Sequence, residues 1–142
     1  MASGKFNFVI EQGTTLNFEI AYTDSGSNKI DLTGYRGRMQ IRDKFPGPSN
    51  KNGSRLILSL SSGLDADGTG LNFSGSSGTN SPTEGTIGVF ISDTNTAAMD
   101  FSKAVYDLEI ATGSEFPVVT RLLQGSVTLD KEVTTFEPDL TA

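Results

Sequence analysis

The sequence predicts a single all-β domain, folded as an antiparallel β-sandwich or barrel, on three observations. Apolar residues recur mainly at every second position, as in strands that bury one face. The 16 glycines, together with many Ser, Thr, Asn and Asp residues, predict frequent turns. Only one short segment has a helical composition, whereas βαβ folds need repeated crossover helices. The 142 residues suit one domain, which we place at residues 1–133, followed by an acidic tail at 134–142.

The expected elements follow from the alternation of apolar residues between turn-forming segments. Residues 43–53 and 75–85 predict exposed loops, because they are rich in Gly, Pro, Ser and Asn. One short helix is expected near 93–101, where Asp93 or Thr94 can cap a turn that contains two alanines. Strands are expected at 6–10, 16–22, 35–42, 54–61, 70–74, 86–92, 106–110 and 117–129.

The last expected strand, PVVTRLLQGSVTL at 117–129, contains Arg121 and Gly125 within an apolar run. Asp107 and Glu109 alternate with apolar residues in the preceding strand, so their face points to solvent. A hairpin between the two strands would bring Arg121 opposite one of these acids. Such a cross-strand pair stabilises a sheet by a few tenths of a kcal/mol up to about 1 kcal/mol.

In a regular strand Val127 would share the solvent face of Arg121, because the two residues are six positions apart. Val127 can reach the core only if one extra residue is inserted after the arginine, and we expect a β-bulge at residues 124–125, where a glycine is available. In this register Val119 and Leu123 flank Arg121 on the outer face. Two apolar side chains beside an arginine predict a contact patch for a partner.

Composition and charge exclude several classes of function. The formal net charge is -6 and the sequence pI is about 4.5, which argues against a partner with a phosphate backbone, so no nucleic acid is expected. No segment resembles a signal peptide or approaches the length of a membrane span, so no membrane is expected.

The chemistry of enzymes has few candidates in this sequence. With no histidine and no cysteine, the chain lacks the usual general base, the commonest zinc ligands and a thiol nucleophile. Asp107 and Glu109 could form a carboxylate pair, but their alternation with apolar residues is typical of a solvent face. The DADG segment at 65–68 matches a calcium loop only in part and predicts a turn. We therefore expect no enzyme, no cofactor and no metal.

Three arginines, Arg36, Arg38 and Arg42, share one face of the expected strand at 35–42. One interpretation is an ordinary solvent face. The other is a docking stripe, because the guanidinium fork suits carboxylates at an interface. The acidic residues near the end of the chain could meet this stripe on a neighbouring copy: Asp130, Glu132, Glu137 and Asp139.

Five segments follow one another in an order that resembles a known family: FVIEQGTTLNFEI, IDLTGYRGRMQIR, TIGVFISDTNTAAMDF, YDLEI and RLLQGSVTLDKEVT. They are similar to small structural proteins of tailed bacteriophages, including those that infect cyanobacteria. The front half, QGTTLNFEIAYTDSGSNKIDLTGYRGRMQIR, also resembles the N-terminal domain of siphophage upper baseplate proteins. That resemblance implies an immunoglobulin-like β-sandwich. The resemblance to phage structural proteins covers most of the chain apart from about 43–84, and no catalytic residue is implied by it.

The resemblance implies a non-enzymatic structural component of a tailed phage virion, made in the host cytoplasm. The expected position is the tail baseplate or fibre-attachment region, where the chain would dock other virion proteins and further copies of itself. A capsid decoration or neck protein is the first alternative, and a receptor- or carbohydrate-binding module that uses the loops at 43–53 and 75–85 is the second. The candidate interface residues are Arg36, Arg38, Arg42, Val119, Arg121, Leu123, Glu132 and Phe136.

Overall fold

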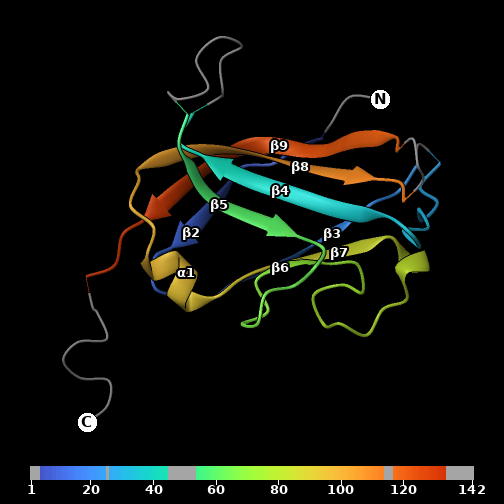
Figure 1. The fold of residues 1–142 in the computed structure, drawn as a ribbon, viewed down its shortest axis with the longest axis horizontal. Coiled ribbons are helices and arrows are strands. Elements are labelled where there is room, and N and C mark those ends of the chain that lie inside the picture. Colours follow the sequence, from blue (N-terminus) through green and yellow to red (C-terminus); the bar gives the residue numbers. More distant parts are fainter. Residues whose placement is uncertain (1–3, 25, 45–53, 114–116, 134–142) are drawn as a thin grey trace.

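The computed structural model describes residues 4–24, 26–44, 54–113 and 117–133, which form two β-sheets and short helical turns (Figure 1). The strands of sheet A are β1 (Gly4–Lys5), β2 (Phe8–Glu11), β4 (Arg36–Arg42), β5 (Leu56–Ser61), β8 (Lys103–Ala111) and β9 (Val119–Asp130). The strands of sheet B are β3 (Leu16–Ala21), β6 (Gly70–Asn72) and β7 (Thr86–Ile91). The helical elements are η2 (Pro82–Glu84) and α1 (Asp93–Ala97). The prediction of a mostly β chain is confirmed.

The order of strands is β1-β9-β8-β4-β5 in sheet A, where β2 also pairs with β9, and β3-β7-β6 in sheet B. Sheet A is mixed, because β1 and β2 run parallel to β9, with Gly4 opposite Leu123 and Phe8 opposite Val127. The prediction of a purely antiparallel fold was therefore wrong for these two pairs. Alternating burial reports which face of a strand is covered, and it is the same for parallel and antiparallel neighbours.

One hydrophobic core joins the two sheets, because apolar side chains from both belong to a single buried cluster. Its fully buried members come from sheet A (Ile10, Met39, Ile41, Leu60, Leu108, Ile110, Val127), from sheet B (Leu71, Ile87, Val89, Ile91) and from the segment between β3 and β4 (Leu32). The residues between them in β4 and β8 are polar or charged and more exposed. The core thus fixes which side of sheet A points outward.

The expected strand at 6–10 begins at Phe8 in the structure, and Phe6 lies between β1 and β2, which pair with β9 in one continuous register. The Phe6 amide donates to the carbonyl oxygen of Gln124 at 3.0 Å, and the Tyr106 hydroxyl donates to the carbonyl oxygen of Phe6 at 2.5 Å. A Cβ atom on Gly125 would collide with that same Phe6 oxygen. Glycine at 125 therefore permits a close approach of two backbones.

The expected helix at 93–101 is shorter in the structure, and its cap differs. Ser92 is the N-cap, and its hydroxyl accepts a hydrogen bond from the Asn95 amide at 3.3 Å, so the assignment of the cap to Asp93 or Thr94 was wrong. The helix ends at Ala97, after which Met99 turns into the core. No helix in the described ranges has the length and apolar character that would let it cross a membrane.

Candidate interaction surface

The candidate site is the side of sheet A that points away from the core, which we call the outer face. Buried and more exposed residues alternate in β4 and β8, so the predicted separation of their two sides is confirmed. The register places Gln40 opposite Asp107 and Arg42 opposite Val105. The outer face consists of Arg36, Arg38, Gln40 and Arg42 on β4, Lys103, Val105, Asp107 and Glu109 on β8, and Val119, Arg121 and Gln124 on β9.

Two ion pairs join the three central strands across the outer face. The Arg38 Nε atom lies 2.8 Å from Glu109 Oε1, which links β4 to β8. On the other side of β8, the Arg121 Nε atom lies 3.5 Å from Asp107 Oδ2. Arg121 is opposite Glu109 in register, so its predicted position beside these acids is confirmed.

Arg42 and Arg36, the other two arginines of the stripe, differ in what they bind. The Arg42 Nε atom donates to Gln40 Oε1 at 3.1 Å, and one terminal nitrogen donates to the Ser54 carbonyl oxygen at 3.1 Å. Arg42 therefore ties the end of β4 to the residues before β5. Arg36 is exposed, and among the salt bridges of the described residues it takes part in none.

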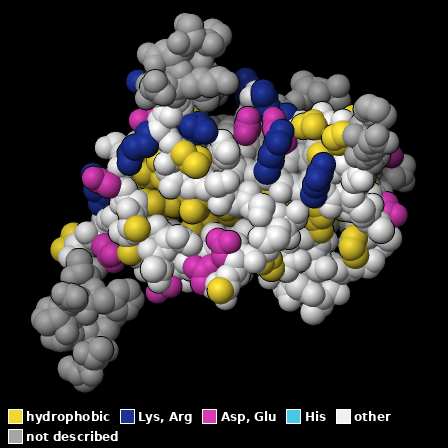
Figure 2. Space-filling model, viewed as in Figure 1, with side chains coloured by type: hydrophobic (Ala, Val, Ile, Leu, Met, Phe, Trp, Pro, Cys, Tyr) yellow, Lys and Arg dark blue, Asp and Glu magenta, His cyan; other side chains and the backbone are white. Residues whose placement is uncertain are grey.

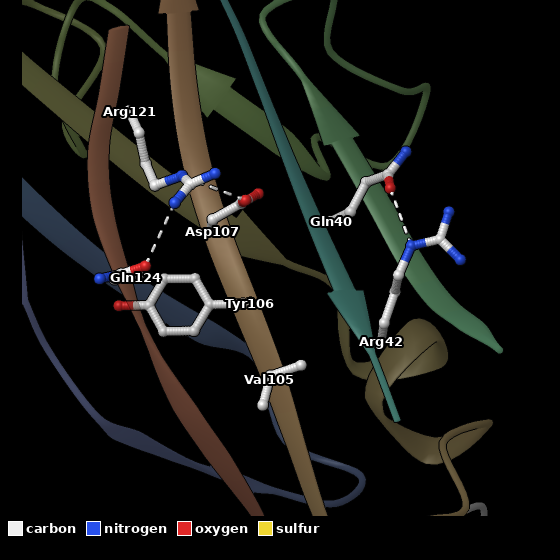
Figure 3. Close-up of a pocket in the computed structure, with 7 residues that line it drawn as sticks. All are labelled: Gln40, Arg42, Val105, Tyr106, Asp107, Arg121 and Gln124. Carbon is white, nitrogen blue, oxygen red and sulfur yellow. Dashed lines mark hydrogen bonds and ion pairs between the residues drawn. The ribbon is translucent and has the colours of Figure 1, made fainter. Parts of the chain in front are cut away.

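A hollow of about 340 Å³ lies over β8 between β4 and β9 (Figure 3). Val105 and Asp107 line its middle, and Arg121 with Gln124 line the β9 side. The Arg121 guanidinium points toward Asp107 and also donates to Gln124 Oε1 at 3.4 Å (Figure 3). The hollow is lined by both hydrogen-bond donors and acceptors, which suits a polar side chain of another protein.

The pKa of the Asp107 carboxyl, on the outer face, lies above its ordinary value. Partial burial raises the pKa of Asp107, and the neighbouring Glu109 carboxylate raises it further. Arg121, Arg38 and, less strongly, Arg42 act in the opposite direction but do not cancel the increase. The carboxylate is therefore incompletely compensated by its own chain.

A second hollow, of about 490 Å³, lies at the end of the outer face near the start of β9. Arg36, Gly63, Pro117 and Val119 are among the residues that line it. Val119 is 48% exposed, so its predicted outward position is confirmed. An exposed apolar side chain beside arginines is a favourable contact for a protein partner.

The β-bulge of β9 exists, but its predicted place was wrong. Arg121 pairs with Glu109 and Leu123 with Leu108, so Leu122 is the extra residue. Gly125 lies in regular register opposite Tyr106. Leu123 therefore shares the side of buried Leu108 and packs against the core, and its assignment to the outer face was wrong.

Glu132, the expected acidic anchor, lies against its own chain. Its amide donates to Gln12 Oε1 at 3.0 Å, and its carboxylate lies against Gly13. The expected use of Glu132 as an anchor for another copy is therefore not supported by its position. Phe136, the last candidate interface residue, lies outside the described residues, as do Glu137 and Asp139.

The DADG segment forms the turn that was predicted. Asp67 Oδ1 accepts from the Thr69 amide at 3.0 Å, and Asp67 Oδ2 accepts from Asn95 Nδ2 at 3.3 Å. The pKa of Asp67 is lowered, first by a hydrogen bond from the Ser92 side chain and then by the Thr69 amide. In the described part of the chain, no group of three or more acidic side chains is arranged to hold a metal ion.

Gln124 and Lys103 are among the outer-face residues that were missed as candidate interface residues. Gln124 supports Arg121, and Lys103 adds a cation at the start of β8. Lys103 lies an even number of residues from Asp107 and could have been assigned to the same face, whereas Gln124 could not be placed without the position of the bulge.

No protein-family model matches the chain, and no curated protein matches it. The chemistry of the outer face is therefore inferred from its side chains, which can bind carboxylates and amides through guanidinium groups.

Proposed function

We propose that this chain is a non-enzymatic structural component of a tailed phage virion, which docks other virion proteins through the outer face of sheet A. Its place is the tail baseplate or the fibre-attachment region. Its fold is an immunoglobulin-like sandwich, with sheets A and B as the two layers. Two sheets that share one buried core support this assignment of the fold.

The observation that carries the proposal is the ordered network of charges on the outer face. Arg38 is held by Glu109 at 2.8 Å, and Arg121 lies between Asp107 and Gln124. Side chains that are already held in place lose less conformational entropy when a partner binds. Arginine is also enriched at protein interfaces, where its planar group pairs with carboxylates and carbonyl oxygens.

The position of the sequence segments within the fold adds support for the phage component of the proposal. The segments that resemble phage structural proteins include β4, β8 and β9, which build the outer face. Arg36, Arg38, Arg42 and Arg121 all lie within these segments. The resembling segments also include β2, β3 and β7, so the resemblance extends over both sheets and is not confined to one recognition loop.

The test is to follow the full chain, carrying a small epitope tag, in a phage whose genome encodes it. We expect the tagged chain to sediment with intact particles and then with isolated tails. Replacing Arg36 with Glu and Val119 with Asp should lower its incorporation by about tenfold, because both side chains are exposed on the outer face. The matched control is Lys44→Glu with Val133→Asp, which makes comparable changes at two exposed side chains outside the strands of sheet A.

A chain that stays in the soluble fraction of the lysate contradicts the proposal. A chain that sediments with DNA-filled heads but not with tails would instead place it as a capsid decoration or neck protein. Binding of the purified chain to a defined glycan, without incorporation into particles, would favour the receptor- or carbohydrate-binding alternative.

A further inference from the structure

The outer face is unusually basic for a chain of net charge -6. It carries five basic side chains and two acidic ones, although two further acids, Glu11 and Asp130, lie at one corner of the sheet. Figure 2 shows most of the dark-blue side chains over the half that contains sheet A, with a few acidic side chains among them, and further acidic side chains near β6 and α1. The charges of the molecule are therefore separated between its two sides.

The two acids of the outer face are already paired, which leaves a cationic remainder. Glu109 is bound to Arg38, and Asp107 lies beside Arg121. Within the described residues, neither Arg36 nor Lys103 belongs to a salt bridge, and both are exposed. These two cations are available to the carboxylates of a second molecule.

The opposite side of the chain has the complementary charge. Residues 16–33 and 64–98 form sheet B and its flanking turns, and they contain seven acidic residues and one basic residue, Lys29. Lys29 is paired with Glu84 at 2.5 Å, whereas Asp65 and Asp93 belong to no salt bridge within the described residues. These two acids are available to cations of another copy.

Apolar contacts match on the two sides as well. Leu64, beside Asp65, is 46% exposed, just as Val119 near Arg36 is 48% exposed. Each surface thus has an exposed apolar side chain next to a charged one, and the two charges have opposite signs. Surfaces of this kind can exclude water at the centre of a contact while their charges set the orientation.

We propose that a second copy of this chain occupies the outer face, with its acidic sheet B side against the basic sheet A side of the first. This inference rests on the proposed function, because it assigns a partner to the same docking face. Two outer faces would repel each other, so the contact joins unlike surfaces. A contact between unlike surfaces repeats from copy to copy and gives a ring or an open stack.

The test is sedimentation velocity of the purified full-length chain over a range of concentrations. We expect association at about 20 mM salt that weakens at least tenfold at about 500 mM salt, because exposed charges are screened over a few ångströms at high ionic strength. Arg36→Glu with Lys103→Glu should remove association, and so should Asp65→Lys with Asp93→Lys. A mixture of the two double variants should associate again, since their reversed surfaces complement those of each other.

The matched control is Lys44→Glu with Lys131→Glu, which changes the net charge by the same amount as the first double variant but outside the outer face. It should associate within about twofold of the unmodified chain. Thermal unfolding of each variant checks that it is folded. A chain that stays monomeric at low salt, or association that survives both reversals, overturns the inference. If that chain still enters particles, the proposed function stands and the occupant of the outer face is another virion protein.

Discussion

Asp107 and Asp67 show how two aspartates of one chain respond to pH in opposite ways. Hydrogen bonds from the Ser92 side chain and the Thr69 amide lower the pKa of Asp67, so the native state holds its proton less tightly than the unfolded chain. That stabilisation is present above the unfolded pKa of about 3.9 and is lost as the pH falls through the lower native value. For Asp107 burial raises the pKa, so its stabilisation is present at low pH and is lost as the pH rises through the native value.

The first prediction follows from the opposite directions of the two pKa shifts. Asp67→Asn should be less stable than the unmodified chain at pH 7, and the difference should shrink as the pH falls below about 3.9, where the unfolded chain takes up the proton first. Asp107→Asn should gain stability relative to the unmodified chain as the pH rises over the same interval, because the amide removes a charge that partial burial and Glu109 disfavour. Urea unfolding midpoints at pH 7 and at about pH 3 measure both differences. If the two differences changed in the same direction with pH, the assignment of either environment would be wrong.

At the scale of elements, β9 is the strand on which the outer face depends. Its bulge at Leu122 lets Val119 and Arg121 face outward while Leu123 and Val127 face the core. A bulge permits this change of parity, because two residues of one strand oppose one residue of its partner. The same strand therefore contributes to both the surface and the core.

The second prediction tests this register. Leu123→Asp should destabilise the fold by about 3 kcal/mol or more, because it places a carboxylate against the core. Val119→Asp should change stability by about 0.5 kcal/mol at most, because Val119 is 48% exposed. The measurement is the free energy of unfolding in urea. Equal costs at the two positions would contradict the bulge at Leu122.

The elements that could be predicted from the sequence are those with uninterrupted alternation. In β4 and β8 every second residue is apolar, so the positions of Arg38 and Asp107 on the outer face followed directly. In β9 the need for a bulge also followed, because Arg121 and Val127 have the same parity but face opposite sides. Its place did not follow, since an extra residue anywhere between them satisfies both ends. Gly125 looked suitable, but its lack of a side chain permits the close approach of the Phe6 backbone instead.

At the scale of the whole molecule, the directions of the strands and the distribution of charge were beyond the sequence pattern. The parallel pairing of β2 with β9 depends on the direction in which the two strands meet in the fold. The alternation of apolar residues is the same for both directions and does not predict it. The arginine stripe was visible, but its excess of positive charge depends on Lys103 and on pairing within the sheet. The outer face can serve as a docking surface only if its strands stay fixed relative to one another. Because sheets A and B share one core, we expect them to unfold as one unit.

The third prediction concerns that cooperativity. Val89 on β7 is fully buried in the core shared by both sheets, so Val89→Ala should cost about 2 kcal/mol. Because the core is continuous, the slowest-exchanging amides of β8 in sheet A should lose as much protection as those of β7 in sheet B. Hydrogen exchange under native conditions, followed by mass spectrometry of peptides from the two strands, measures both losses. Val9→Ala on β2 makes the same change at a side chain that is 53% exposed, and it should leave both strands nearly unaffected. A loss of protection confined to β7 would mean that sheet B opens independently of the sheet that carries the docking surface.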